Sequence, residues 1–419
     1  MRKFFKWVGY SIAVVLILGI LYLGNLFFMK PLSLDHYLGK EVILEFLDSP
    51  EALTYMGIVD RFNWITHHQS KISITGLEDL EEDLIEAKKA KSMLLAFNDT
   101  SLTKQQKITK KIAVFDLNNT IEEAEKFPYH SYPLNQIGGI HLNRVEFMTD
   151  IHPIRSVKEA KAYIDRLNLF DDSFKATLEV LDAQREAGIY PPKFVFDHVI
   201  RQLTEFLNYE KEENPLREVF VRKIKQLELD TETSKDLVSK LDLAIEDSVK
   251  PGFSLLLGFM YATLPHANLH HGVWSLPNGD DFYALRLKVY TTTNYSAEEI
   301  HNIGLSEVQR ITKRMQEILG QLGYGNNLNV GKLMNELNAD PKFLYADTPD
   351  RKQVVVKDYA DIVEETWSAA KSSFHKMPES KVEVRAVPEY SDQIQVPPFI
   401  EVGDKIILDT RNCEYVKKV

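Results

Sequence analysis

Cysteine is almost absent from this sequence, since Cys413 is the only one among 419 residues. A single cysteine excludes an intrachain disulfide and a cysteine-rich zinc site, and its place near the C-terminus excludes acylation of a cysteine near the N-terminus. Long basic runs are also missing, and the formal net charge is −11. The phosphate-neutralising surface of a nucleic-acid-binding protein is therefore not expected. We predict no nucleic acid among the partners.

Two catalytic motifs are missing as well. None of the 12 histidines is followed directly by Glu, so the sequence has no His-Glu-x-x-His zinc helix. It also has no Gly-x-Ser-x-Gly nucleophile elbow, and Cys413 lies in a charged tail. These absences argue against a serine or cysteine hydrolase and leave zinc peptidase activity without its usual ligands.

A charge-free run near the N-terminus is the clearest local signal. Residues 7–28 carry no charged side chain and follow Arg2, Lys3 and Lys6. Such a run can cross a hydrocarbon core of about 30 Å as a helix, and the preceding charges place the N-terminus in the cytoplasm. We predict a cytoplasmic tail over 1–6, a single-pass transmembrane anchor and an extracytoplasmic main domain. A cleaved signal peptide and a soluble core helix are the alternatives.

The rest of the chain is expected to be a linker over 29–40 and a helical domain over 41–419. Apolar residues recur there at helical spacing. The spacing predicts helices over 79–97, 157–167, 173–187, 193–209, 215–227 and 231–250. Gly188 is placed to end one helix, and Pro191 and Pro192 to begin the next.

Strand signals are confined to the second half of the chain, over 282–290, 382–387 and 399–409. Pro277-Asn278-Gly279 predicts a tight reversal with Trp274 and Tyr283 on either side of a hairpin-like bend. The predicted fold class is mainly α, a helical metallopeptidase-like domain with a small β-sheet, preceded by one transmembrane helix.

A capping box formed by Ser296 and Glu299 begins a further helix that runs to about residue 322. Its apolar residues fall on one face, which is predicted to be packed. Four polar residues of this helix are the candidate site residues: Glu298, His301, Glu307 and Arg310.

Each pair among these candidates has two interpretations. Glu298 and His301 are spaced like a metal-binding pair of helical bundles, but one pair cannot complete a metal site, and charge at the helix start is the alternative. Glu307 and Arg310 indicate either an exposed ion-pair ladder or a polar group held for a substrate.

Other residues offer weaker signals for a site. His266 and His270 are four residues apart, as zinc ligands on a helix often are, and His271 follows. Flanking Pro265 and Gly272 favour a loop instead. The stretch 127–143 is irregular and rich in aromatic residues, and a loop of this length often has a function.

The segment LPNGDDFYALRLKVYTTTNYSAEEIHNIGLSEVQRI at 276–311 resembles the bacterial family named domain of unknown function 885. Three other segments agree in order: HSYPLNQIGGIHL at 130–142, AKAYIDRLNLF at 160–170 and REAGIYPPKFVFDHVIRQL at 185–203. The likeness spans roughly residues 38–411. The family is similar to helical zinc carboxypeptidases, so the resemblance implies a helical peptidase-like fold.

The resemblance also implies that the zinc ligands of complete members follow a strand like the one expected at 399–409. We therefore expect the domain to be C-terminally incomplete, with no zinc or other cofactor and no assignable catalytic residue. The predicted function is a membrane-anchored extracytoplasmic relative of zinc peptidases, a hydrolase family, inactive here because the motif is missing. The alternative is a non-catalytic module at the membrane that binds a peptide or protein.

Overall fold

The computed structural model describes residues 2–325, 329–380, 382–384, 406–409 and 414–418. The chain divides into two compact units, Met1–Ile300 and His301–Val419. Each unit is described by itself below.

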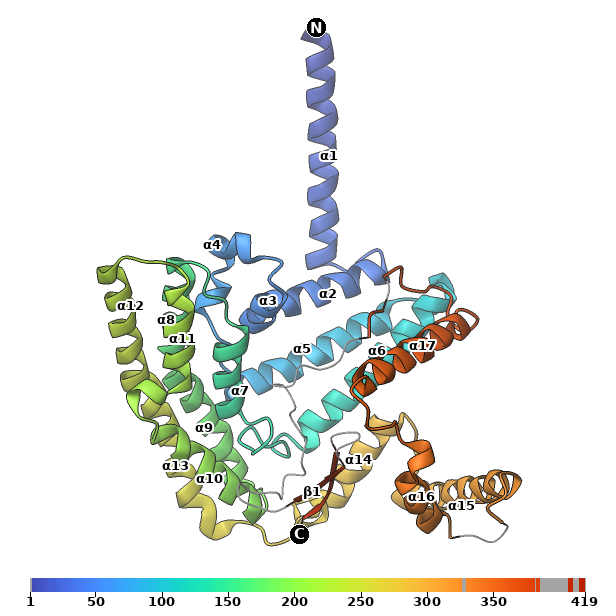
Figure 1. Ribbon diagram of the computed structural model, residues 1–419. Coiled ribbons are helices and arrows are strands. Elements are labelled where there is room, and N and C mark those ends of the chain that lie inside the picture. The colour runs from blue at the N-terminus through green and yellow to red at the C-terminus, as the bar shows by residue number, and fades with distance from the viewer. Residues whose placement is uncertain (1, 326–328, 381, 385–405, 410–413, 419) are drawn as a thin grey trace. The chain divides into compact units, whose positions relative to one another are not determined.

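Helices form almost all of the first unit (Figure 1). They are α1 Arg2–Phe28, α2 Leu34–Asp48, α3 Pro50–Met56, α4 Asn63–Thr66, α5 Leu77–Ala96, α6 Lys104–Lys126, α7 Ile140–Glu146, α8 Val157–Leu167, α9 Phe170–Glu186, α10 Lys193–Leu207, α11 Pro215–Lys225, α12 Thr231–Ala244, α13 Lys250–Thr263, α14 Gly279–Thr291 and the start of α15 Ala297–Gln321. The prediction of a mainly α fold is confirmed.

Local signals in the sequence explain where several helices begin and end. The Ser156 side chain accepts the N–H of Glu159 at 3.2 Å, which caps α8 at its predicted start. Gly188 follows α9 with φ +73°, a conformation that glycine adopts without steric cost. The helix predicted over 231–250 is longer than expected, because a π turn over Ile245–Val249 joins α12 to α13.

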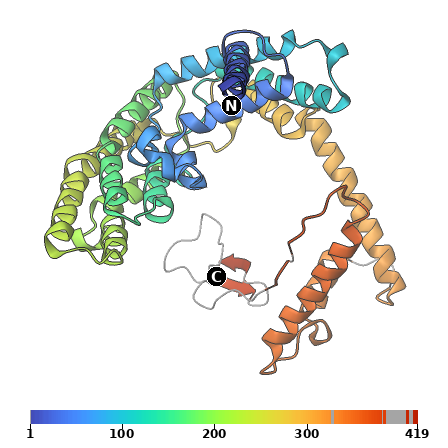
Figure 2. The same cartoon turned by 90° about the horizontal axis from the view of Figure 1, so that it is seen from above.

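Helices α8 to α13 surround the main hydrophobic core and form one group in both views (Figures 1 and 2). Aromatic side chains fill its centre. The rings of Phe206 on α10 and Phe253 on α13 are stacked with centroids 3.9 Å apart, and Phe174 on α9 meets Phe253 edge-on at 5.4 Å. This packing fixes α9, α10 and α13 against one another.

One buried arginine ties the segments before α8 to this bundle. The Arg166 side chain on α8 is fully buried. It donates to the backbone oxygens of Pro50 at 3.3 Å, His68 at 2.7 Å and Lys71 at 2.8 Å. It also donates to Thr54 Oγ1 at 2.7 Å. Burial lowers the pKa of Arg166 to about 10, but the group stays charged at neutral pH because these acceptors replace water.

His152 completes the contacts of this guanidinium. Its Nδ1 lies 2.7 Å from a guanidinium nitrogen of Arg166, and its Nε2 lies 3.2 Å from the backbone oxygen of Glu159. Since arginine can only donate, Nδ1 is the acceptor and Nε2 carries the hydrogen. Burial and then the charge of Arg166 lower the pKa of His152 to about 3. The ring is therefore neutral in the folded protein.

Helix α1 does not support the predicted transmembrane anchor at 7–28. Within the described residues, no helix is long and apolar enough to cross a membrane. A span needs about 20 consecutive apolar residues, and α1 begins with basic residues and contains the polar Asn25 near its end. The Asn25 side chain donates a hydrogen bond to the backbone oxygen of Lys30 and accepts one from the backbone N–H of Leu32. The predicted anchor is wrong, and the single-pass localisation that depended on it is withdrawn.

Residues 282–290 form part of helix α14 instead of the predicted strand. Asn278 has φ +52° and directly precedes the helix, and Asp280 and Asp281 in its first turn favour a helix start. A short apolar alternation fits either period, so it did not distinguish a strand from a helix. The hairpin-like bend predicted between Trp274 and Tyr283 is likewise a short 3-10 turn followed by α14.

The second unit contains the rest of α15, then α16 Val330–Ala339, α17 Arg351–Ala370 and a two-stranded antiparallel sheet of β1 Ile406–Asp409 and β2 Glu414–Lys418. The small sheet predicted near the C-terminus is thus present at 406–409. Residues 382–384 form no strand, and the other strand positions predicted at 385–387 and 399–405 lie outside the described residues. The α15 face predicted to be packed leaves Val308 and Ile311 exposed.

Replacing Arg166 with Met should destabilise the first unit strongly. The substitution leaves several buried acceptors without a donor, and each such group costs about 1–3 kcal/mol. We expect the free energy of unfolding to fall by about 3 kcal/mol or more in urea titrations followed by circular dichroism. The control is Arg222→Met, whose charge is exposed and should matter by less than about 1 kcal/mol. Equal losses in the two variants would contradict the role given to Arg166.

The stability of the protein should fall in acid partly because of His152. Its folded-state pKa of about 3 lies below its ordinary value of 6.5, so the unfolded chain binds more protons between these values. The stabilising contribution is fully present above pH 6.5 and is lost as pH falls toward 3. We expect the free energy of unfolding of His152→Asn to vary less with pH over this range than that of the wild type. The exposed variant His36→Asn should keep the wild-type slope.

Candidate functional site

Two irregular loops of the first unit meet at a pocket. The 127–139 loop follows α6, and the 264–278 loop follows α13. They enclose a volume of about 140 Å³, which we call the His130 pocket. It is lined by His130, Tyr132, Tyr190, Pro192, Asn268, His270, His271, Gly272, Val273, Ser275, Leu276 and Phe282.

The 127–139 loop is attached to the helical bundle by two glutamine side chains. Gln184 on α9 donates to the backbone oxygens of Tyr129 at 2.9 Å and of Ser131. Gln202 on α10 donates to the backbone oxygen of Gln136 at 3.1 Å. Helices α9 and α10 of the bundle therefore position this loop.

Asn268 organises the 264–278 loop. Its backbone N–H donates to the backbone oxygen of Pro191 at 3.2 Å, and its backbone oxygen accepts from the backbone N–H of Lys193 at 2.8 Å. These two bonds join the loop to the start of α10. Its side chain donates to Ser275 Oγ at 2.6 Å and accepts the His270 N–H at 2.8 Å. Asn268 thus joins the loop to α10 and also links two positions within the loop.

Helix α14 closes the pocket from the side of α6. Arg286 on α14 pairs with Glu123 on α6 at 3.0 Å. This contact places the Phe282 ring 4.8 Å from His130 and 5.4 Å from Phe127, measured between ring centroids. The His130 ring therefore packs against the Phe127 ring of its own loop and the Phe282 ring of α14.

His130 and Tyr132 bring polar groups to the wall of the pocket. His130 is 8% exposed, and its Nε2 donates to the Pro277 oxygen at 2.7 Å. Its Nδ1 is buried and has no hydrogen-bond partner in the described structure. Burial raises the pKa of Tyr132 to about 12, so its hydroxyl keeps its proton at neutral pH.

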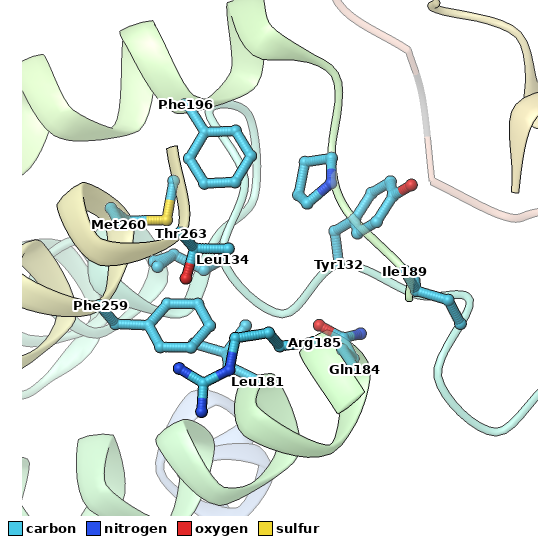
Figure 3. Close-up of a pocket in the computed structure, with 11 residues that line it drawn as sticks. Tyr132, Leu134, Leu181, Gln184, Arg185, Ile189, Phe196, Phe259, Met260 and Thr263 are labelled. Carbon is cyan, nitrogen blue, oxygen red and sulfur yellow. The ribbon is translucent and has the colours of Figure 1, made fainter. Parts of the chain in front are cut away.

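A smaller pocket adjoins this one and shares Tyr132 with it (Figure 3). Its other walls come from α9, α10 and α13 and include Phe196, Phe259 and Met260. Its volume of about 10 Å³ is roughly that of one water molecule. The buried Thr263 hydroxyl beside it has no protein partner in the described structure, which suits a single bound water. The larger His130 pocket is the candidate ligand site.

The four candidate residues predicted from the sequence are exposed on α15. Among the described contacts, only Glu307 and Arg310 are brought together, as an ion pair at 2.7 Å. The hydrogen bond from Arg310 lowers the pKa of Glu307, as expected for a helix-surface pair. Glu298 and His301 lie near the start of the same helix.

The three neighbouring histidines lie in the 264–278 loop, as the flanking Pro265 and Gly272 indicated. His270 and His271 line the pocket, whereas His266 stacks on Tyr190 with ring centroids 5.6 Å apart. Among the described residues, no group of three or more His, Cys, Asp or Glu side chains could hold a metal ion. The resemblance placed the zinc ligands of complete family members after a strand like the one expected at 399–409 and not at these histidines, and we derive no chemical step through zinc.

A family comparison covers most of the chain. Residues 50–412 match the family described as "Bacterial protein of unknown function (DUF885)". The chain belongs to the DUF885 family. This confirms the family resemblance found in the sequence, including the segments that carry the pocket residues His130 and Phe282.

Two solved structures share the fold of this DUF885 chain. One is a crystal structure from Colwellia psychrerythraea, provisionally described as a lipoprotein, with TM-score 0.65 and 23% identity, covering 83% of this chain and 62% of the other. The second is from Shewanella oneidensis, provisionally described as a lipoprotein of unknown function, with TM-score 0.59 and 13% identity, covering 88% and 63%. The chain spans less than two thirds of either structure.

A second likeness is local. Over 26 residues the chain is 81% identical to elongation factor P of Pelagibacter ubique, which is 6% of this chain and 14% of that protein. Over 35 residues it is 49% identical to elongation factor P 1 of Chlamydia pneumoniae, or 8% and 19%. The chain therefore spans less than a fifth of these curated relatives. Neither the family description nor those of the two similar structures name a hydrolase, so the predicted hydrolase class is corrected to the family alone.

The sequence offered signals for both halves of the His130 pocket but not for their contact. The aromatic loop over 127–143 and the histidines at 266–271 each stood out. Their separation in the chain is bridged by the hydrogen bond from His130 to Pro277 and by the packing of α14 on α6. Both contacts join residues far apart in the chain, so neither could be predicted from the spacing of residues in a single sequence.

Gly279→Ala should loosen the 264–278 loop. An added Cβ would lie 2.0 Å from the backbone oxygen of Val273, so the backbone on one side of the pocket must move. We expect faster hydrogen exchange of amides in the 264–278 loop, measured by mass spectrometry. Gly258→Ala on α13 is the matched control, because a Cβ there meets nothing within 4 Å. Unchanged exchange in both variants would show that the loop tolerates the clash.

Proposed function

We propose that the chain is a binding module that holds a peptide or an extended protein segment, with one side chain of the ligand anchored in the His130 pocket. The proposal develops the non-catalytic alternative drawn from the sequence. The observation that carries it is the combination of a ring-sized pocket with exposed apolar side chains next to its lining residues.

The size of the pocket favours a single anchoring group. Sites for small molecules and cofactors usually enclose about 300–1,000 Å³, and the His130 pocket encloses about 140 Å³. A cavity of about 150 Å³ accommodates a benzene molecule. The pocket therefore has room for one side chain and too little for a whole cofactor.

The surroundings of the pocket favour a polypeptide ligand. Leu269 is 75% exposed and Trp274 is 60% exposed, and both are neighbours in sequence of lining residues. Tyr283 beside Phe282 is also exposed, as is Phe194, whose ring lies 5.0 Å from that of His271. We call these four residues the apolar rim. An anchor in a pocket bordered by apolar contacts is the usual arrangement of a peptide or protein hot spot.

Peptide binding should depend on the apolar rim. The probes are labelled nonapeptides, acetylated and amidated, with one central aromatic residue in an otherwise Gly/Ser sequence. We expect saturable binding of the full chain in fluorescence anisotropy, and a loss of about tenfold or more in affinity for Trp274→Ala. The loss arises because the substitution removes a large contact next to the anchor.

Tyr283→Ala and Tyr261→Ala form a matched pair for this test. Both remove an exposed tyrosine, but Tyr283 belongs to the apolar rim and Tyr261 lies on α13 and does not line the pocket. Only Tyr283→Ala should weaken binding. Equal binding by both variants, or no preference over an all-Gly/Ser peptide, would refute the proposed function.

A further inference from the structure

Helix α15 carries an apolar seam that repeats every seven residues. From Gly304 onward its apolar residues are spaced alternately by four and three positions, which is the a and d pattern of a heptad repeat. The d positions hold Gly304, Ile311 and Ile318, and the a positions hold Val308, Met315 and, directly after the helix, Leu322. We call these six residues the α15 seam. A repeat of this kind is typical of a helix that packs along its length against one other helix.

The described structure leaves much of the α15 seam uncovered. Val308 is 63% exposed and Leu322 is 66% exposed. A Cβ added at Gly304 would meet nothing within 4 Å. Among the described residues of 301–380, Leu319 is the one apolar side chain that is buried. Because a contiguous apolar stripe is unfavourable in water, we expect another polypeptide to cover it.

Charges of opposite sign border the α15 seam on one side. Glu307 and Arg314 occupy the two g positions, seven residues apart, and both side chains are exposed. Each pairs along its own helix, Glu307 with Arg310 at 2.7 Å and Arg314 with Glu317 at 3.0 Å. Exposed pairs of this type are weak and leave both charges able to interact with a second helix. Charges at g positions commonly decide which helix pairs and in which direction.

The residues of the α15 seam complement those of a second copy that runs antiparallel. In that arrangement each a residue lies opposite a d residue of the other helix, so Val308 can be set opposite Ile311. The same register sets Met315 opposite Gly304, where the structure leaves open space. A large side chain thus meets a small residue, as interdigitated packing requires.

The charges agree with the same register. In an antiparallel pair the g positions of the two helices are neighbours, and this register brings Glu307 of each copy beside Arg314 of the other. In a parallel pair the g positions would instead face e positions, which are the uncharged Thr312 and Leu319. Apolar layers and charges therefore both favour an antiparallel second copy.

We propose that the chain forms a homodimer in which the α15 seams of two copies pack as an antiparallel coiled coil, with ion pairs between Glu307 and Arg314 across the interface. The dimer uses none of the residues that line the His130 pocket and does not depend on the proposed peptide binding. It gives the Glu307 ladder noted in the sequence a second role, in which it selects the direction of the second helix.

The first test places a charge on the α15 seam or directly beside it. Val308→Glu puts a carboxylate in the interface, whereas Gln309→Glu adds the same charge at the neighbouring exposed position. Because Val308 is exposed in a single copy, both variants should keep the wild-type circular dichroism spectrum. In sedimentation equilibrium of the full chain at tens of micromolar, we expect dimers for the wild type and for Gln309→Glu and monomers for Val308→Glu. A monomeric wild type would mean that another polypeptide covers the seam, and equal association of the two variants would place the interface elsewhere; either result overturns the inference.

The second test reverses the charges at the g positions. Glu307→Arg and Arg314→Glu each set like charges against one another in their own dimers, so we expect the dimer Kd of each variant alone to rise by about tenfold. An equimolar mixture of the two variants restores opposite charges and should associate as tightly as the wild type. Lys313→Glu, at an exposed position that points away from the seam in the heptad pattern, is the control and should leave the Kd unchanged. A mixture that associates no better than either variant alone would refute the antiparallel pairing.

Discussion

The buried guanidinium of Arg166 is the constraint on which the first unit depends. Within the described structure no carboxylate contacts it directly, so its donors are satisfied by backbone oxygens, Thr54 and His152. A charge in this position is stable only while all of these acceptors are present. The chain segments before α8 must therefore fold onto the bundle together with it. Charge-assisted hydrogen bonds to Glu51 from Arg144 and Ser73 add a second connection nearby.

The pocket depends indirectly on the same helical bundle. Helices α9 and α10 carry Gln184 and Gln202, which hold the 127–139 loop, and the start of α10 binds Asn268 of the 264–278 loop. The histidine that both loops enclose keeps one nitrogen bonded to the protein and one without a partner. Rigid helices thus hold in place the two loops that line the pocket.

Several local features could be predicted from the sequence for clear physical reasons. The periodicity and the Ser156 cap define α8, and Gly188 ends α9 because glycine adopts a positive φ without a clash. The strand predicted over 282–290 was wrong because a short alternating run does not distinguish the two periods. The predicted span at 7–28 was wrong, since no helix in the described part of the chain is long and apolar enough to cross a membrane. The described structure neither assigns nor removes a function for Glu298 and His301.

The sequence by itself determined the helical class, the positions of α5 and of α8 to α12, and the family, because spacing, caps and segment likeness are local properties of the chain. Only the tertiary structure decided that Arg166 would join the segments before α8 to the bundle, since three of its acceptors are backbone oxygens that any residue could supply. It also decided the site. His130 and Pro277 lie 147 positions apart, and only folding places the imidazole against that carbonyl.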